Sequence, residues 1–386
     1  MNRDVVIVSA ARTPIGSFMG AFSNVKAQTL GAIAIREAIK RAGIDPSIIE
    51  EGIIGNIAGT EPKGNPAREA LLEAGLPIGI PSFTVNKNCA SSIKSVSLAA
   101  SLIKAGESDI ILAGGMENMT RIPYIFRNAR SGFRMGNQPC TDLLTDLLEG
   151  MGLTAERIAE KYNISREEQD QFALRSQMNA TTAQELGIFD DEIVPVEIQG
   201  RKEITIISKD EGIKPNTTME TLSKLRPNFK KDGTVTAGNS STINDAGAAL
   251  LLMTADKAKQ LGLKPLVKIK AWASAGCDPD IMGIGPVPAT KRLLEKTGMN
   301  LNDFDLVELN EAFASQSLAV LKELDFDINK VNVNGGAIAL GHPTGATGAV
   351  LLTKLIYSMK KRSAETGLIT LCIGGGQGMS IALENI

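Results

Sequence analysis

Apolar residues along this chain follow two alternating spacings, beginning close to the N-terminus. Residues 5–9 form a continuous β-branched run, which is typical of a buried strand. Residues 32–42 place apolar side chains at helical spacing and end before Gly43, a residue suited to a helix C-terminus. The same patterns continue at residues 53–56, 82–85, 91–105 and 109–113, where the last predicted strand ends in Gly114-Gly115. Strand–helix alternation of this kind predicts an α/β fold.

The pattern changes between residues 119 and 242. Polar segments with glycine and proline alternate there with short charged helices, of which residues 166–186 are an example. A buried strand resumes at residues 246–253, and strand–helix alternation returns from residue 265. We therefore expect a loop domain inserted into the first of two α/β halves. The expected boundaries are 1–118 plus 243–264 for the N-terminal half, 119–242 for the loop domain and 265–386 for the C-terminal half.

The two α/β regions also resemble each other in sequence. In residues 38–56 a helix, a glycine, an aspartate, two aliphatic residues and an asparagine follow in order, and this order recurs in residues 290–310. Val-Asn-Lys-Asn at 85–88 precedes one helix, and Val-Asn-Val-Asn at 331–334 leads towards another. The repetition predicts two duplicated halves. A generic similarity between α/β units is the alternative that remains open.

Composition and charge exclude several classes of function. The chain has 386 residues, 43% of them hydrophobic, and a net charge of −2, so no large basic surface points to nucleic acid. No apolar run approaches the roughly 18 residues of a membrane span, and the N-terminus does not read as a secretory signal. Four scattered cysteines without a CxxC pair, and one histidine, argue against a metal site and suit the reducing cytoplasm.

The one histidine, His342, lies between Gly341 and Pro343, directly before an expected helix at residues 346–359. A lone histidine is usually structural, but glycine next to it allows the backbone to approach a ligand closely. A histidine in a tight turn before a helix is well placed to act on a bound substrate. We therefore treat His342 as a candidate catalytic residue.

Two cysteines share such a setting. Cys89 follows a strand and opens a helix, where free N–H groups favour a thiolate, although most free cysteines are buried and inert. Its polar surroundings argue against the inert alternative. Cys372 closes the expected strand at residues 367–372 and precedes Gly-Gly-Gly-Gln-Gly, whose backbone N–H groups could bind an oxyanion.

Asn310 completes the set, because it ends a predicted strand where polar residues of α/β sheets meet ligands. Cys140 and Cys277 have no comparable context and are interpreted as structural or incidental. Two cysteines, one histidine and one asparagine at strand ends or turns suggest acyl transfer through a thioester. One thiolate would be the nucleophile, and the second cysteine could accept a proton.

At this point the chain resembles the thiolase family over essentially its whole length. The matching segments, in order, are VNKNCASS around Cys89, GGMENMT at 114–120, GFRMG at 132–136, TAGNSSTINDAGA at 236–248, LNEAFA at 309–314, NGGAIALGHPTGATG at 334–348 and CIGGGQG at 372–378. The segment with GFRMG is more similar to the biosynthetic, acetoacetyl-CoA-forming branch. The resemblance implies two duplicated βα halves packed in five layers (αβαβα), with a loop domain that binds coenzyme A and makes oligomer contacts.

The resemblance also implies roles for individual residues. Cys89 would take an acetyl group from acetyl-CoA, activated by His342, and Cys372 would remove the α-proton of a second acetyl-CoA. Asn310 would hold a water in the oxyanion hole that it shares with His342, and the N–H groups of Cys89 and Gly374 would form a second hole. The remaining implied binding residues are Ser241 and Lys214 for coenzyme A and Met151, Met282 and Phe313 for the acyl pocket.

The implied activity is a Claisen condensation of two acetyl-CoA to acetoacetyl-CoA and CoA, with the reverse thiolysis, in a homo-oligomer (tetramer or dimer) without cofactor or metal. Four positions depart from the family pattern: Ser92 and Thr242 replace glycines, Gly150 stands where histidine is frequent, and Lys214 stands where arginine is frequent. A degradative 3-ketoacyl-CoA thiolase of broader chain length and a non-catalytic acyl-CoA binding protein are the alternatives. Ketoacyl synthases, by contrast, need a second histidine or a dedicated glutamate base, and this chain has no second histidine.

Overall fold

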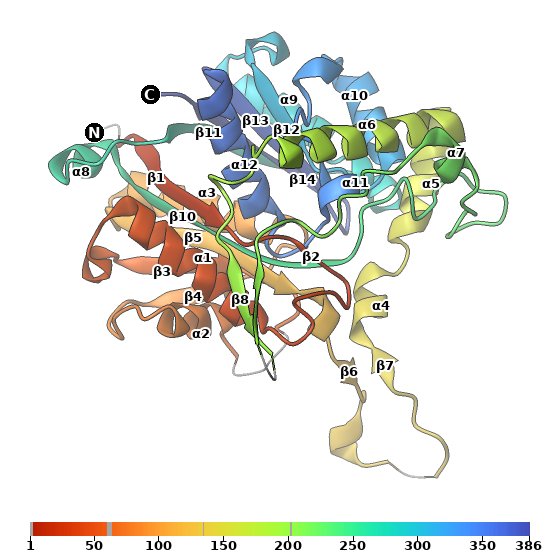
Figure 1. Ribbon diagram of the computed structural model, residues 1–386, viewed down its shortest axis with the longest axis horizontal. Helices are drawn as coiled ribbons and strands as arrows, with labels where there is room; N and C mark the ends of the chain where they lie inside the picture. The colour runs from red at the N-terminus through yellow and green to blue at the C-terminus, as the bar shows by residue number, and fades with distance from the viewer. Residues whose placement is uncertain (1–2, 60–63, 134, 201–202) are drawn as a thin grey trace.

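The apolar runs of the sequence form one continuous sheet in the computed structural model, which describes residues 3–59, 64–133, 135–200 and 203–386 (Figure 1). The N-terminal half comprises β1 Val5–Arg12, β2 Gly16–Ser17, α1 Ala27–Ala42, β3 Glu51–Gly55, α2 Pro66–Glu73, β4 Ser82–Val85, α3 Ser91–Ala105, β5 Ile110–Asn118, β10 Asn244–Thr254 and α8 Ala255–Gln260. The C-terminal half comprises β11 Val267–Gly276, the 3₁₀ helix η4 Pro279–Ile284, α9 Pro286–Thr297, β12 Leu306–Leu309, α10 Ala314–Leu324, α11 Ala337–Leu340, α12 Thr347–Arg362, β13 Thr366–Ile373 and β14 Gln377–Glu384.

The order of the strands reveals the duplication. In the described residues the sheet runs β12-β13-β14-β11-β1-β10-β5-β3-β4, with β2 paired to β10. Outward from the β1–β11 seam, each half continues with an antiparallel neighbour, β10 or β14, then another antiparallel strand, β5 or β13, and then a parallel one, β3 or β12. The duplicated α/β halves predicted from the sequence are therefore confirmed.

Helices cover and separate the two halves in five layers. Helices α1 and α2 bury one apolar cluster against the outer face of the N-terminal half, and α9 and α10 bury another against the C-terminal half. Helices α3 and α12 lie side by side between the halves and share the largest cluster with both (Figure 1). Since α3 follows Cys89 and α12 follows His342, this central layer places both residues near the middle of the molecule.

Local signals set most helix and strand ends. Strand β4 and helix α3 have the bounds predicted from the sequence, and α1 ends at Gly43, whose φ of 66° is left-handed. The prediction that β5 ends at Gly114-Gly115 is wrong, because the strand continues to Asn118. A Cβ on Gly114 would lie 2.2 Å from the Ala248 carbonyl oxygen, so this glycine permits close approach of β10 within the sheet.

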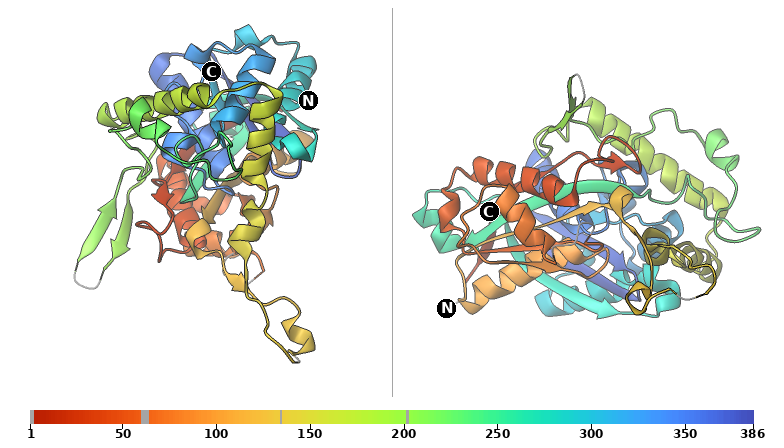
Figure 2. Two further views of the ribbon diagram at one scale, coloured as in Figure 1. Left: turned by 90° about the vertical axis from the view of Figure 1, so that its right-hand side faces the viewer. Right: turned by 90° about the horizontal axis from the view of Figure 1, so that it is seen from below.

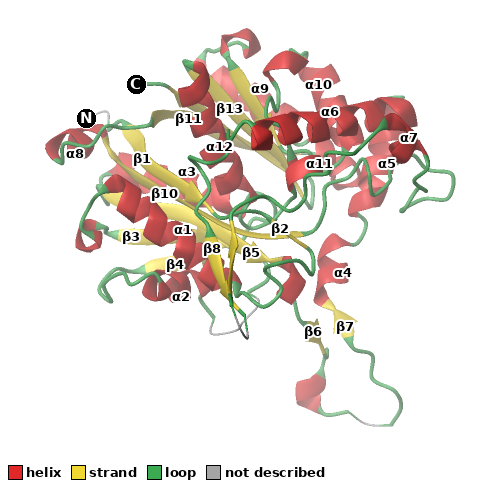
Figure 3. Cartoon of the chain, in the orientation of Figure 1, coloured by secondary structure: helices red, strands yellow, loops and turns green. Residues whose placement is uncertain are grey.

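The segment between β5 and β10 stands apart from the large sheet. Its elements are β6 Tyr124–Ile125, β7 Thr141–Asp142, α4 Leu143–Leu148, α5 Met151–Lys161, α6 Arg166–Glu185, β8 Val196–Gln199, β9 Ile204–Ile207 and α7 Met219–Ser223. Its described strands pair only as β6 with β7 and β8 with β9, and both pairs project from the body (Figures 2 and 3). A buried ion-pair cluster attaches it to β1, because Arg12 contacts Glu192 at 2.7 Å and Asp210 at 2.8 Å.

None of the described helices combines the length and apolarity that a membrane crossing requires.

Candidate active site

Cys89 lies in a tight turn between β4 and α3. Asn88, directly before it, has a left-handed φ of 47°, and the carbonyl oxygen of Asn88 accepts hydrogen bonds from Ser91 N (2.9 Å) and Ser91 Oγ (2.7 Å). Ser91 Oγ in turn accepts from Lys87 N at 2.9 Å. The turn therefore satisfies its own polar groups and holds the Cys89 thiol at the start of α3.

The surroundings of Cys89 differ from the prediction. Its side chain is partly exposed and packs against the central apolar cluster, so the expectation that little around Cys89 is apolar is wrong. Burial raises the pKa of the Cys89 thiol, and the backbone N–H groups of Gly374 and of Cys89 itself offset this only in part. Burial therefore acts against the predicted thiolate enrichment in the free protein.

His342 is buried, with 7% of its surface exposed, and is held from two sides. Its backbone N–H donates to Asn244 Oδ1 at 2.9 Å, and its Nδ1 lies 2.7 Å from Thr347 Oγ1. Because Thr347 gives its one hydroxyl hydrogen to the Pro343 carbonyl (3.0 Å), Oγ1 accepts from Nδ1–H and leaves Nε2 unprotonated. Burial lowers the pKa of His342 to about 4, so the ring is a neutral proton acceptor near pH 7.

Contacts between α3 and α12 bring the two turns together. Ser92 Oγ accepts a hydrogen bond from Ala349 N at 2.9 Å, within the first turn of α12. A Cβ on Gly348 would lie 2.5 Å from Ile93 N, so glycine allows the two helix backbones to meet closely. Cys89 and His342, which lie on opposite halves of the sequence, thus precede helices that touch at their N-terminal turns.

Cys372 lies at the end of β13 in a small apolar cluster. The cluster consists of Cys372, Met282 and Ala312, and Met151 and Phe313 pack at its edge. Three of these, Met151, Met282 and Phe313, are the residues that the resemblance assigns to an acyl pocket. The structure therefore brings the predicted pocket residues together around the second cysteine.

The Cys372 thiol is wholly buried. Burial raises its pKa strongly, and the proximity of Cys89 and Cys277 raises it further. The two predicted reactive cysteines are neighbours, because Asn88, directly before Cys89, donates to the carbonyl of Gly374, two residues after Cys372. Cys277, interpreted from sequence as incidental, also lies beside the site, with its Sγ 3.7 Å from the Met282 carbonyl oxygen.

Asn310 follows β12 and is completely buried. Its backbone N–H donates to Thr370 O at 3.1 Å, but neither Nδ2 nor Oδ1 of its side chain has a hydrogen-bond partner among the described residues. Leaving both ends of a buried amide unsatisfied is costly and rare. An amide kept in this state fits a group that holds a water or a substrate oxygen.

The two residues expected to contact coenzyme A lie nearer the surface. Ser241 is partly exposed, and its backbone N–H donates to the Ala312 carbonyl at 2.9 Å, so it borders the apolar cluster around Cys372. Lys214 is exposed on a loop next to α11, and its backbone N–H donates to Gln177 Oε1 at 2.8 Å. Its ammonium group has no ion-pair partner among the described residues and can meet a charged ligand at the surface.

The sequence of this chain matches a known protein family along both halves. The family models for the N-terminal and C-terminal domains of thiolase match residues 5–256 and 263–385. The chain belongs to the thiolase family. It is 51% identical to an acetyl-CoA acetyltransferase of Chromobacterium violaceum, with 99% of each chain covered.

Solved thiolase structures agree closely with this one. The acetyl-CoA acetyltransferase of Bacillus anthracis superposes with a TM-score of 0.98 at 44% identity, covering both chains completely. Human mitochondrial 3-ketoacyl-CoA thiolase superposes with a TM-score of 0.96 at 40% identity, covering 100% of this chain and 99% of the other. The five-layer thiolase fold expected from the motifs is confirmed.

Three of the four positions where this thiolase departs from the family pattern have local explanations. Ser92 adds the hydrogen bond from Ala349 N of α12. Thr242 Oγ1 donates to Asn244 Oδ1 at 2.8 Å and so supports the same oxygen that accepts the backbone N–H of His342. Gly150 has a left-handed φ of 77° before α5, a backbone conformation that favours glycine over histidine. Of GFRMG, Arg134 lies outside the described residues.

Sequence reasoning missed several residues that organise this thiolase site. Thr347 could have been found, since it follows His342 by five residues in the same motif. Asn244 and Glu117 are distant in sequence from the histidine turn, yet Glu117 Oε2 accepts from Gly345 N at 3.1 Å. Burial raises the pKa of Glu117 to about 7. Both residues lie within quoted family segments, which could have singled them out, but their contacts with the histidine turn depend on the folded sheet.

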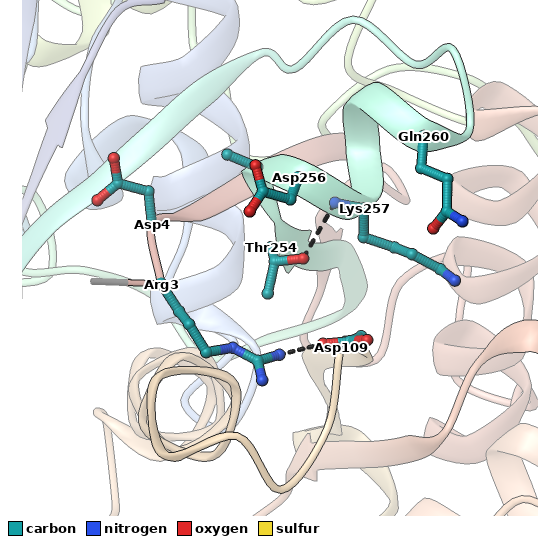
Figure 4. A pocket seen from close by; sticks show the side chains of 8 residues that line it. Arg3, Asp4, Asp109, Thr254, Asp256, Lys257 and Gln260 are labelled. Carbon is teal, nitrogen blue, oxygen red and sulfur yellow. Dashed lines mark hydrogen bonds and ion pairs between the residues drawn. The ribbon is translucent and has the colours of Figure 1, made fainter. Parts of the chain in front are cut away.

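A surface hollow elsewhere on the molecule does not belong to this site. It lies where β1, β5 and β10 begin or end and is lined by Arg3, Asp4, Asp109, Thr254, Ala255, Asp256, Lys257 and Gln260 (Figure 4). Arg3 forms an ion pair with Asp109 there, so the charge of this arginine is already neutralised. No group of metal-binding side chains occurs among the described residues of the thiolase.

Proposed function

We propose that this thiolase condenses two acetyl-CoA molecules to acetoacetyl-CoA and CoA, and catalyses the reverse thiolysis, by a ping-pong mechanism through a thioester on Cys89. One observation carries the proposal: Asn88, directly before Cys89, hydrogen-bonds the carbonyl of Gly374, two residues after Cys372, so two cysteines from different halves lie close together beside an apolar cluster. A neutral buried histidine and an unsatisfied buried amide provide the acid–base and oxyanion groups. Relatives named acetyl-CoA acetyltransferase support the acetyl group as the substrate.

The first half-reaction forms the acetyl-enzyme. The Cys89 thiol passes its proton to Nε2 of His342 while the sulfur attacks the acetyl carbonyl carbon. This concerted transfer suits a pair that is neutral at rest, because burial disfavours both the thiolate and the imidazolium. The N–H groups of Cys89 and Gly374 stabilise the oxyanion, the bond to coenzyme A breaks, and the departing sulfur takes the proton of Cys372.

The second half-reaction forms the carbon–carbon bond. Cys372, now a thiolate, removes the α-proton of a second acetyl-CoA, and the enolate oxygen is stabilised by the His342 imidazolium and a water on Asn310. The enolate carbon attacks the Cys89 thioester, and the sulfur of Cys89 leaves. His342 returns its proton to that sulfur. Both thiols and the neutral histidine are thereby restored, and the reaction requires no cofactor or metal.

Separate replacement of the two cysteines tests this assignment. Cys372→Ala should still acetylate Cys89 and exchange labelled coenzyme A at a reduced rate, but should lose acetoacetyl-CoA formation by at least about 100-fold. Cys89→Ala should lose both activities, whereas Cys140→Ala, an exposed cysteine on the projecting segment, serves as the control. Equal loss of acetylation and condensation in Cys372→Ala would refute the division of roles. If the protein were a non-catalytic acyl-CoA binder, the parent protein would release no free coenzyme A from acetyl-CoA.

A degradative activity on longer acyl chains is the second candidate, because the human 3-ketoacyl-CoA thiolase shares this fold at 40% identity. The pocket argues for short chains. Phe313 is braced by Phe229, with ring centroids 6.1 Å apart, and together with Met151 and Met282 it fills the space next to Cys372. Thiolysis rates with 3-ketoacyl-CoA substrates of increasing length should therefore fall beyond acetoacetyl-CoA. A rate that rises with length would favour the degradative assignment.

The proposal also includes a cytoplasmic homo-oligomer, a tetramer or a dimer. The projecting segment between β5 and α5 exposes large apolar side chains, namely Tyr124, Phe126, Phe133, Met135 and Leu147. Apolar groups gathered on a projection are typical of a protein interface. Four unpaired cysteines suit the reducing cytoplasm. Sedimentation analysis should give a mass of two or four times 40.9 kDa.

A further inference from the structure

The residue before the nucleophile links the two halves of the molecule. Asn88 Nδ2 donates to the Gly374 carbonyl oxygen at 3.0 Å, across 286 residues of sequence. The N–H of the same glycine favours the thiolate of Cys89. Asn88 thus holds the carbonyl group of Gly374, and the N–H group of Gly374 acts on the sulfur of Cys89, the residue after Asn88.

The loop that Asn88 holds would otherwise have considerable freedom. Gly375 and Gly376 follow with φ values of 89° and 83°, and a Cβ on Gly375 would contact nothing within 4 Å. Further along, the loop is held by Cys277 N donating to Gly376 O (2.8 Å) and by Lys87 Nζ donating to Gln377 Oε1 (3.0 Å). Among the described residues, only Asn88 hydrogen-bonds the Gly374 carbonyl.

Backbone geometry explains why asparagine can occupy this position. Asn88 has a φ of 47°, a left-handed conformation that asparagine and glycine tolerate better than most residues. Glycine would satisfy the backbone equally well but would leave Gly374 without its partner. Position 88 therefore requires a left-handed backbone and a side-chain donor to the Gly374 carbonyl, and asparagine meets both requirements.

We propose that Asn88 is a positioning residue that holds the Gly374 N–H against the Cys89 sulfur and thereby sets both the acidity of the thiol and the geometry of the thioester oxyanion hole. The effect on turnover rests on the proposed thiolase reaction. The effect on thiol acidity belongs to the free protein and requires no substrate. Asn88 acts through Gly374 and does not itself touch the reacting carbonyl.

Two substitutions separate the amide from the backbone requirement. Asn88→Gly keeps the left-handed conformation and removes the donor. Asn88→Asp also tolerates that conformation but places a carboxylate against the Gly374 oxygen. The matched control is Asn163→Gly, because Asn163 has a φ of 48° after α5 and its side chain makes no hydrogen bond within the described part of the chain.

The first measurement is the pH dependence of Cys89 alkylation by iodoacetamide, followed by peptide mass spectrometry. Loss of the Asn88 amide should raise the apparent pKa of the Cys89 thiol by roughly 0.5–1 unit, with a larger rise in Asn88→Asp. The second measurement is steady-state turnover, in which kcat should fall by at least about tenfold while KM changes little. Asn163→Gly should match the parent protein in both.

Each outcome decides the proposal. An alkylation profile and a kcat equal to those of the parent, or changes no larger than those of Asn163→Gly, would overturn it. So would failure of Asn88→Gly to fold, because that variant preserves the backbone conformation and would reveal a structural role. If the parent protein lacks condensation activity but the alkylation shift is observed, the proposed function fails and the positioning role of Asn88 stands.

Discussion

The contact between Thr347 and His342 gives a sharp test of how the histidine is prepared for proton transfer. Thr347→Val keeps the shape of the side chain and removes the oxygen that lies 2.7 Å from His342 Nδ1. The ring is buried, so no solvent replaces the lost acceptor. The variant should lose the preference for a proton on Nδ1, and the tautomer with a proton on Nε2 cannot accept one from Cys89.

The size of the effect follows from the burial of the ring. A buried donor left without its acceptor costs about 1–3 kcal/mol, which corresponds to a roughly 5- to 150-fold loss of rate when the correct tautomer is needed in the transition state. Thr353→Val is the matched control on the same helix, α12. Thr353 is equally buried and donates to Ala349 O at 2.8 Å, as Thr347 does to Pro343 O at 3.0 Å, but it does not contact His342.

The assay is single-turnover acetylation of Cys89 by acetyl-CoA, followed by quenching and peptide mass spectrometry. Thr347→Val should slow this step within the stated range, and it should lose more stability than Thr353→Val, because it loses the contact with His342 Nδ1 in addition to one hydroxyl bond to a carbonyl. An acetylation rate in Thr347→Val equal to that in Thr353→Val would show that the tautomer of His342 is not set by Thr347. A Thr347→Val protein that does not fold would contradict the reasoning as well.

Three further predictions concern buried polar groups. Burial lowers the pKa of His342 from 6.5 to about 4, so the unfolded chain binds a proton that the folded chain does not. The free energy of unfolding should therefore fall by up to about 3 kcal/mol as the pH is lowered from 6.5 to about 4, and urea titrations of His342→Gln should lack this loss. Asn310→Leu should leave the melting temperature unchanged or higher, since the amide has no partner, while condensation falls at least about tenfold; a lower melting temperature would contradict this. Lys354→Met leaves Glu308 unpaired and should lower the free energy of unfolding by about 3–5 kcal/mol at pH 8. The loss should be smaller at pH 6, because the pKa of Glu308 is about 7 and the carboxyl is then mostly protonated. An equal loss at both pH values in denaturant titrations would argue against this prediction.

Features with a local origin could be predicted from the sequence. The helix that starts at Ser91 and the left-handed end of α1 at Gly43 depend on residues within a few positions, and both were predicted correctly. The duplicated halves were also accessible, because each half repeats the same order of strand and helix signals. The family motifs added the packing of these halves, which apolar spacing alone does not determine.

Features that depend on distant contacts were not accessible. Gly114 looks like a strand end until the Ala248 carbonyl opposite it is known. The acidity of Cys89 was predicted from its helix start, whereas burial by both halves decides the direction of its pKa. Asn244, which holds the backbone of His342, lies 98 residues away in sequence, so no local pattern reveals the pair.

The position of β1 at the centre of the sheet has a consequence for biosynthesis. All eight residues of β1 are buried, and its two neighbours are β10, beginning at Asn244, and β11, beginning at Val267. Ribosomes add about 5–20 residues per second, so roughly 10–50 s pass between the emergence of β1 and that of its first partner. During this interval an apolar strand with free edges is exposed on the nascent chain and is prone to aggregation. Yield of the folded protein should therefore depend on translation speed and on chaperones that bind the first residues of the chain.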